Sequence, residues 1–224
     1  MFAFSQIPAF LDVNSVFFSV LDYPVSYVEF TGAITGLVSV LLAAKSNIWT
    51  WASGLINVAC FFSIFYQVQL YSDMFLQIYF FAASIYGWII WSRQNKQEEN
   101  PIRVLTRHQK IVLAATIIFS TAALGFFIQN IHTVFPNFFQ KPASYPYIDT
   151  FIAVLSVLAT ILLAKRILEN WYLWIVVDVL SVGLYAAKNV MLISIEYIIF
   201  LCIASFGLYN WLRLKNDEKR ISAR

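Results

Sequence analysis

The chain has 224 residues, of which 60% are hydrophobic and only 12% are charged. Soluble domains carry roughly 25% charged residues, so this composition excludes an ordinary soluble protein and indicates an integral membrane protein. The net charge of +3 does not indicate binding to nucleic acid, because the basic residues lie mainly in the loops on one side of the predicted spans, as is typical of a membrane protein.

The first 26 residues precede the first long apolar run. They lack the basic region and the small-residue cleavage pattern of a secretory signal, so we expect them to belong to the mature protein. The stretch "IPAFLDVNSVFFSVLDYP" is interrupted by Asp12, Asn14 and Asp22 and bracketed by Pro8 and Pro24. It therefore predicts an interfacial segment over residues 1–26, with a helix lying on the membrane surface rather than crossing it.

Seven apolar stretches follow, each long enough to cross a bilayer core of about 30 Å. They cover residues 27–44, 49–67, 73–91, 110–130, 148–164, 171–187 and 191–212. Of the 15 lysines and arginines, all but Lys141 and Lys188 fall on one side of these spans. Because basic loops stay in the cytoplasm, we predict an external N-terminus and a cytoplasmic C-terminus, with residues 213–224 as a basic tail.

The two halves of the chain resemble one another. The run "YVEFTGAITGLVSVLLAAK" from Tyr27 matches "YIDTFIAVLSVLATILLAK" from Tyr147, and "SIYGWIIW" matches "ASFGLYNW", both at a spacing of 120 residues. Between them, "WTWASGLIN" is matched with "WYLWIVVDV" after a slightly longer second loop, and Asn57, close to the middle of its helix, is taken as the counterpart of Asp178. The pattern predicts an internal duplication.

Each half then forms a three-helix repeat, over residues 27–92 and 147–212. Segment 93–146 adds a cytoplasmic loop, one linking helix and an external loop. Because three helices end on the opposite face from where they begin, the linking helix lets the second repeat enter in the same direction as the first. We therefore predict an all-α membrane protein of 3+1+3 helices with parallel repeats, a plan in which transporters place the substrate near the bilayer midplane.

Four segments resemble the Pnu vitamin transporter family. They are "GLINV" from Gly54, "QLYSDMFLQIYFFAASIYGWIIWSRQ" from Gln69, "ENWYLW" from Glu169 and "SIEYIIF" from Ser194. The resemblance implies a duplicated SWEET-like fold, a bacterial inner-membrane location, a homo-oligomer, and facilitated diffusion of a vitamin that a cytoplasmic kinase then traps by phosphorylation. Members are assigned to nicotinamide riboside, thiamine or riboflavin. We expect an importer of nicotinamide riboside for NAD synthesis, with a thiamine uniporter as the alternative.

Asp178 is the first candidate substrate-binding residue. It lies near the middle of its predicted span, where an ionised carboxylate costs about 2.5 to 3.5 kcal/mol. One interpretation is that it contacts a permanently cationic ligand, since nicotinamide riboside and thiamine each carry a positive ring. The other is that it is protonated, or hydrogen-bonded to a neighbouring helix for stability alone.

Trp171 and Trp174 share a helix face with Asp178, so they are candidates for an aromatic wall beneath a cationic ring. All seven tryptophans, however, fall near cytoplasmic helix ends. An interfacial aromatic belt explains that pattern without a ligand, and for Trp171 it is the favoured interpretation.

Five further positions complete the candidate set: Asn57, Gln77, Tyr197, Tyr185 and Glu196. A carboxamide both donates and accepts hydrogen bonds, which suits the amide and the ribose hydroxyls of the expected substrate. Bonding between helices accounts equally well for Gln77. For Glu196, an external ion pair with Lys188 is the favoured alternative.

Other function classes are disfavoured by what the sequence lacks. No nucleophile–base pair, zinc motif or nucleotide-phosphate loop is present, so we expect no enzyme, no cofactor and no built-in ATP coupling. Cys60 and Cys202 lie in apolar runs and predict neither a disulfide nor a metal site. A seven-helix receptor or sensor is the remaining alternative, although the last span has no lysine for a retinal Schiff base and duplication is unexpected there.

Overall fold

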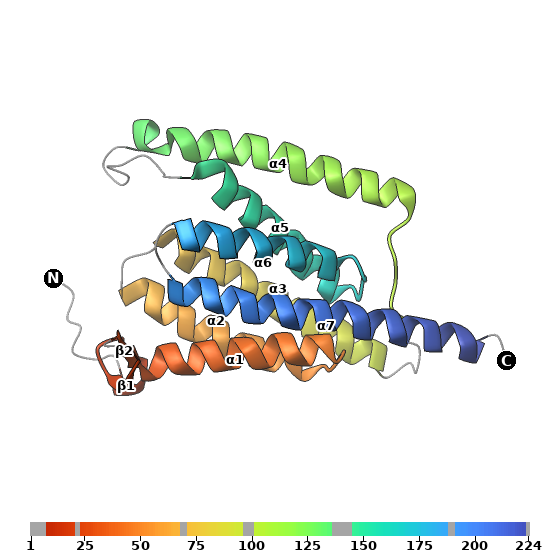
Figure 1. The fold of residues 1–224 in the computed structure, drawn as a ribbon, viewed down its shortest axis with the longest axis horizontal. Helices are drawn as coiled ribbons and strands as arrows, with labels where there is room; N and C mark the ends of the chain where they lie inside the picture. Colours follow the sequence, from red (N-terminus) through yellow and green to blue (C-terminus); the bar gives the residue numbers. More distant parts are fainter. Residues whose placement is uncertain are drawn as a thin grey trace. The chain divides into compact units, whose positions relative to one another are not determined.

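The computed structural model describes residues 8–20, 23–67, 71–95, 101–135, 145–187 and 191–222. Two compact units make up the chain, Met1–Asn100 and Pro101–Arg224. Seven α-helices and one two-stranded sheet are found in the described residues, and Figure 1 labels them in chain order.

The first unit contains three helices, α1 (Tyr27–Ala44), α2 (Trp49–Gln67) and α3 (Tyr71–Asn95). Helix α2 packs against both α1 and α3. Small polar side chains join α1 to α2: the Ser39 hydroxyl donates to the Thr50 carbonyl at 2.8 Å, and the Thr50 hydroxyl donates back to the Ser39 carbonyl at 2.8 Å. Such short side chains allow two helices to approach closely inside a membrane.

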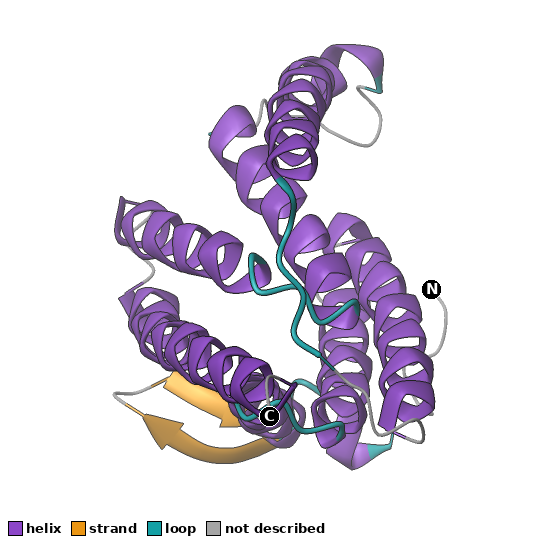
Figure 2. Ribbon diagram, turned by 90° about the vertical axis from the view of Figure 1, so that its right-hand side faces the viewer, coloured by secondary structure: helices purple, strands orange, loops and turns teal. Residues whose placement is uncertain are grey.

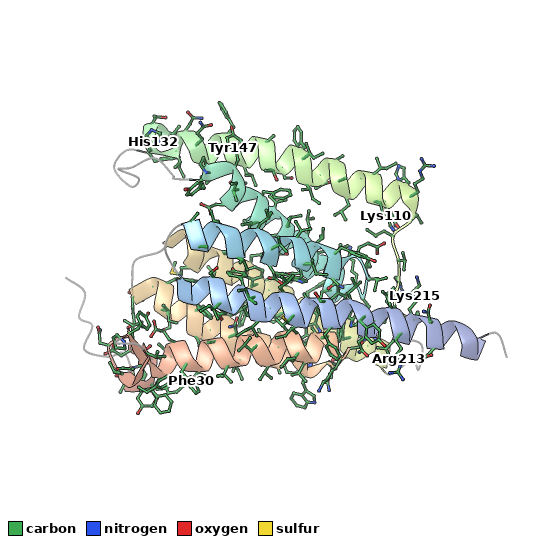
Figure 3. All side chains as sticks on the ribbon, viewed as in Figure 1. Phe30, Lys110, His132, Tyr147, Arg213 and Lys215 are labelled. Carbon is green, nitrogen blue, oxygen red and sulfur yellow. The ribbon has the colours of Figure 1, made fainter. Side chains whose placement is uncertain are left out.

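The second unit contains four helices: α4 (Arg107–Val134), α5 (Pro146–Ala164), α6 (Asn170–Ala187) and α7 (Met191–Ser222). Each packs against the next in the chain. Helices α4 and α5 meet where Tyr147, labelled in Figure 3, lies against Gly125 and donates its hydroxyl to Gln129 Oε1 at 3.1 Å.

All seven predicted spans coincide with helices within a few residues at most ends. Five stretches are long and apolar enough to cross a membrane: Tyr27–Ala44, Trp49–Gln67, Arg107–Val134, Pro146–Ala164 and Ser194–Asp217. The chain is thus a multi-pass membrane protein. Helix α6 contributes a shorter apolar stretch, Asn170–Leu184, and for α3 and α6 the crossing stays a prediction.

Helix α7 continues beyond the predicted end of its span at residue 212. It remains helical to Ser222, with Arg213 Nε 4.0 Å from Asp217 Oδ2 one turn later. Figure 3 places Arg213 and Lys215 on this extension. The basic tail therefore begins as the last turns of α7, because residues 213–222 include neither proline nor glycine to end the helix.

The prediction of an interfacial helix before α1 is wrong. The segment forms a short 3₁₀ turn, η1 (Ala9–Leu11), and an antiparallel hairpin of β1 (Val16–Val20) and β2 (Tyr23–Ser26), drawn as the orange strands of Figure 2. Strand β1 is Val-Phe-Phe-Ser-Val, a run of β-branched and aromatic residues that favours a strand over a helix.

Contacts with α2 hold the N-terminal segment in place. The Gln67 side chain accepts from the Val13 N–H at 3.2 Å and donates to the Leu11 carbonyl at 2.7 Å. Leu11 and Val13 also pack against a buried cluster on α1 and α2 that includes Val28. The segment therefore covers the ends of these two helices, where α1 begins and α2 ends.

A buried tryptophan pair joins the last helix of the second unit to the helix before it. The rings of Trp171 on α6 and Trp211 on α7 meet edge to face with centroids 5.7 Å apart, and Trp171 lies directly over Gly207. The first unit has the same arrangement in Trp51, Trp91 and Gly87, with ring centroids 5.4 Å apart. Edge-to-face packing favours both pairs beyond the burial of their area.

These tryptophans correct the alignment of the two halves. Trp51 and Trp171 are 120 residues apart, and so are Ser46 and Arg166, the two non-glycine residues with positive φ, both at 55°. The spacing therefore stays at 120 residues through the turn and the tryptophans, whereas the sequence comparison matched Trp49 with Trp171, at a spacing of 122. At this constant spacing the counterpart of Asp178 is Val58, and the pairing of Asp178 with Asn57 is wrong.

Candidate functional site

The second unit buries a carboxylate within α6. Asp178 is 3% exposed, eight residues after the helix begins at Asn170 and nine before it ends at Ala187. Within the described ranges, its carboxylate takes part in no hydrogen bond or ion pair. A charge withdrawn from water is unfavourable unless it is paired, so the burial of Asp178 makes it a candidate contact for a cationic ligand.

Two neighbours share the helix face of Asp178. Trp174 lies four residues earlier and is half-buried, so part of its indole remains accessible. Ser181 lies three residues later, is fully buried, and its hydroxyl has no hydrogen-bond partner among the described residues. Residues three and four apart are neighbours on a helix, so an aromatic surface, a carboxylate and an unused hydroxyl lie along one stripe of α6.

The structure excludes Trp171 from a lipid-facing belt. Its side chain is 1% exposed because Trp211 and Gly207 cover it inside the second unit. Trp51 and Trp91 are buried in the same manner in the first unit, whereas Trp49 is exposed. The aromatic-belt interpretation of Trp171 is therefore wrong, and Trp174 has more accessible surface for contact with a ligand.

Asn57 joins two helices of the first unit. Its Nδ2 donates to the Gly32 carbonyl at 2.8 Å, which links α2 to α1. A Cβ atom on Gly36 would lie 2.7 Å from the same nitrogen, so that glycine makes room for the carboxamide. One N–H of the Asn57 carboxamide is thus used inside the unit, while the role of this residue toward a ligand stays a prediction.

The other candidates lie on the last helix of their units or on the helix before it. Gln77 is half-buried on α3 of the first unit, and Glu196 and Tyr197 are half-buried on α7 of the second. The Tyr197 ring packs against Phe200 with centroids 6.1 Å apart. The side chain of Tyr185 and the whole of Lys188 lie outside the described residues, so the ion pair considered for Glu196 is not tested.

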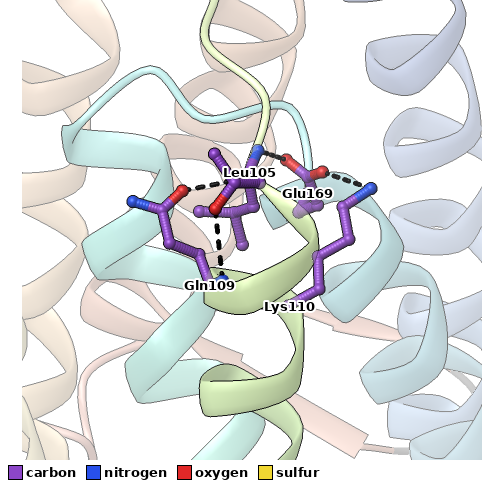
Figure 4. Close-up of polar contacts among 5 residues, drawn as sticks. Leu105, Gln109, Lys110 and Glu169 are labelled. Carbon is purple, nitrogen blue, oxygen red and sulfur yellow. Dashed lines mark hydrogen bonds and ion pairs between the residues drawn. The ribbon is translucent and has the colours of Figure 1, made fainter.

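One carboxylate at the start of α6 was absent from the predicted site. Glu169 is 7% exposed and is shared by two partners: Lys110 Nζ lies 3.0 Å from Oε1, and the Leu105 N–H donates to Oε2 at 3.1 Å (Figure 4). Leu105 lies in the segment that leads into α4, and Lys110 lies in the first turn of that helix. The only sequence signal was its position at the head of "ENWYLW".

Metal chemistry finds no support in the described residues, where no group of three or more His, Cys, Asp and Glu side chains could hold an ion. Asp178 and Ser181, the two buried polar side chains of the stripe, are instead suited to an organic molecule that is bound by charge and hydrogen bonding.

A family model described as nicotinamide mononucleotide transporter matches residues 26–213. The nicotinamide riboside transporter PnuC of Escherichia coli (strain K12) is 35% identical over 215 residues, which cover 88% of this chain and 89% of that protein. The riboflavin/roseoflavin transporter RibM of Streptomyces davaonensis is 24% identical, covering 93% of this chain and 96% of its own length.

The fold also has a solved counterpart. A crystal structure of the vitamin B3 transporter PnuC superimposes with a TM-score of 0.65 at 24% identity, over 85% of this chain and 83% of that chain. The resemblance found in the sequence is confirmed by the family model and by the Escherichia coli relative, both of which extend over most of the chain. This protein therefore belongs to the nicotinamide mononucleotide transporter family.

Proposed function

We propose that the protein imports nicotinamide riboside by facilitated diffusion across the bacterial inner membrane, for NAD synthesis. Asp178, a buried carboxylate without a partner among the described residues of α6, is the observation that carries this proposal. The relative from Escherichia coli, named as a nicotinamide riboside transporter, supports the same substrate.

The charge of the substrate distinguishes the candidate vitamins. Nicotinamide riboside has a permanently cationic pyridinium ring, and thiamine has a cationic thiazolium ring. Either ring compensates Asp178, and Trp174 one turn away offers the face of an indole to the same cation. Riboflavin, the cargo named for the Streptomyces relative, is neutral and gives the carboxylate no partner.

The same carboxylate disfavours a phosphorylated substrate. A phosphate monoester carries about −1.5 to −2 charges at neutral pH, so a mononucleotide would bring like charge toward Asp178. Phosphorylation by a cytoplasmic kinase would therefore trap the imported riboside, which gives uptake a direction without energy coupling in the carrier itself. Glu196, Gln77, Tyr197, Tyr185 and Asn57 remain proposed contacts for the amide and the ribose, and a homo-oligomer remains proposed from family resemblance.

The proposed architecture is a 3+1+3 arrangement of parallel repeats, with α4 as the linking helix. The constant spacing of 120 residues between the two turns and the two tryptophan pairs supports it. The distribution of lysines and arginines supports an external N-terminus and a cytoplasmic C-terminus.

Green fluorescent protein fused after Arg224 tests this orientation, because it becomes fluorescent in the cytoplasm and not when exported unfolded to the periplasm. We expect bright cells with this fusion. As a control, fusion after Lys141, in the predicted external loop, should give dark cells. The opposite pattern would reverse the proposed topology.

Calorimetric titration of the purified protein with nicotinamide riboside, thiamine and riboflavin tests the substrate. We expect saturable binding of nicotinamide riboside at concentrations where riboflavin gives no heat, because only the cation compensates Asp178. Binding of thiamine alone would keep the transport mechanism and reassign the vitamin. Uptake of the bound vitamin into proteoliposomes separates a transporter from a receptor, which would bind without accumulating it.

A further inference from the structure

The segment that leads into α4 is fastened to the turn between α5 and α6. Arg103 forms a parallel β-bridge with Ile167: its N–H donates to the Arg166 carbonyl at 2.9 Å, and its carbonyl accepts from the Leu168 N–H at 2.9 Å. The neighbouring Ile102 is buried. Main-chain hydrogen bonds and apolar burial therefore hold residues 101–106 against this turn, all within the second unit.

Glu169 completes the attachment with its side chain. One carboxylate oxygen meets the ammonium group of Lys110 in the first turn of α4, and the other accepts from the Leu105 main chain, as Figure 4 shows. Both oxygens are used, and the carboxylate is buried while Lys110 is half-exposed. A hydrogen bond to an ionised acceptor is about twice as strong as one between neutral groups, so this side chain is a firm link between α4 and the start of α6.

The matching turn of the first unit lacks this side chain. Its backbone is alike, with Ser46 in the positive-φ position of Arg166. At the spacing of 120 residues, however, Glu169 corresponds to Trp49, which is 63% exposed. The main-chain N–H of Trp49 donates to Asn47 Oδ1, two residues earlier, at 2.9 Å. A turn of this geometry therefore forms without a carboxylate, and the buried acid of the second unit has a purpose other than folding the turn.

We propose that Glu169 is a positioning residue for transport, which sets the resting balance between the forms of the carrier open to either side. It immediately precedes α6, the helix that presents Trp174 and Asp178 to the substrate. A displacement of this end of α6 relative to α4 must lengthen or break the contacts of Glu169. The clamp, meaning Glu169 with Leu105 and Lys110, therefore favours one position of α6, and its loss shifts the equilibrium. This inference rests on the proposed function.

Transport kinetics from both sides of the membrane test the clamp. For a facilitated carrier, the apparent affinity on one side of the membrane becomes weaker when a smaller fraction of the molecules faces that side. We expect Glu169→Gln, which keeps an acceptor for Leu105 but loses the ionic contact, to move the half-saturation concentrations for uptake and efflux of radiolabelled nicotinamide riboside in opposite directions. Their ratio should change by at least about threefold. Lys110→Met should change the ratio in the same direction.

Trp49→Gln is the matched control, since it alters the same turn position in the first unit and should leave the ratio unchanged. A variant that only folds less well loses maximal rate with both half-saturation concentrations intact, and that result for Glu169→Gln would overturn the proposal. If the parent protein gives no saturable uptake of nicotinamide riboside, the proposed function fails by itself. The clamp is then tested by amide hydrogen exchange at Leu105 and Leu168. Faster exchange in Glu169→Leu than in the parent protein supports the clamp, and unchanged exchange contradicts it.

Discussion

Replacing Asp178 with asparagine is expected to weaken the binding of nicotinamide riboside by about 30-fold or more, which corresponds to the lower end of the 2–5 kcal/mol lost when one partner of a buried charge pair is removed. Asparagine has nearly the shape of aspartate and keeps one acceptor oxygen, so the change removes charge with little change in packing. The cationic ring would then enter a buried site without a compensating anion.

Calorimetry on both proteins measures this effect. Asp217→Asn serves as the control, because Asp217 is exposed on the end of α7 and pairs only loosely with Arg213 at 4.0 Å. Removing that surface carboxylate should leave affinity unchanged. If Asp178→Asn binds nicotinamide riboside as tightly as the parent, Asp178 is a structural residue and the charge argument for the substrate is lost.

Adding one methyl group at Gly207 is expected to destabilise the protein strongly. A Cβ atom there would lie 2.7 Å from the Trp171 ring, and at Gly87 it would lie closer still to the Trp51 ring. Neither ring has room to move away, because each is buried and held edge to face by a second buried tryptophan. Overpacking of this kind costs about 1–3 kcal/mol, more than the gain in helix propensity of roughly 0.5–1 kcal/mol from glycine to alanine.

Thermal denaturation in detergent compares Gly87→Ala and Gly207→Ala with Gly183→Ala. Gly183 is also inside a helix, but apart from its chain neighbours and the backbone of its own helix, nothing in the described residues lies within 4 Å of a Cβ placed there. That variant should unfold at the parent's temperature or above it, while the other two unfold at lower temperatures. Equal unfolding temperatures for Gly207→Ala and Gly183→Ala would show that the tryptophan pairs tolerate expansion.

The helices were predictable because each is determined by its own stretch of sequence, an apolar run with polar or charged residues at its ends. The N-terminal segment before α1 was not predictable, since its partner lies far along the chain. The side chain of Gln67 on α2, more than 50 residues later, accepts a hydrogen bond from the Val13 N–H and donates one to the Leu11 carbonyl. A polar interruption every few residues was interpreted as a surface helix, although the composition of β1 favoured a strand. Long-range bonding decided the outcome.

The site was predictable in part for a similar reason. A carboxylate amid apolar residues is conspicuous, and Asp178 proves to be buried, while its contact with a ligand remains a prediction. Glu169 gave no comparable signal, because its partners Leu105 and Lys110 are about 60 residues earlier and only the folded turn brings them together. The mistaken alignment around Asn57 and Asp178 arose because Trp171 can be matched with either Trp49 or Trp51, and only the packing identifies Trp51 as its equivalent.

The hydrogen bonds between the N-terminal segment and Gln67 determine when this segment can fold during synthesis of the chain. Leu11 and Val13 leave the ribosome long before Gln67, the last residue of α2, so their hydrogen bonds with its side chain wait until α2 has been made. Pulling-force measurements on nascent chains should therefore record a folding event after α2 is complete. Chains stopped before Gln67 should lack it, and a Gln67→Leu chain should show it weakened.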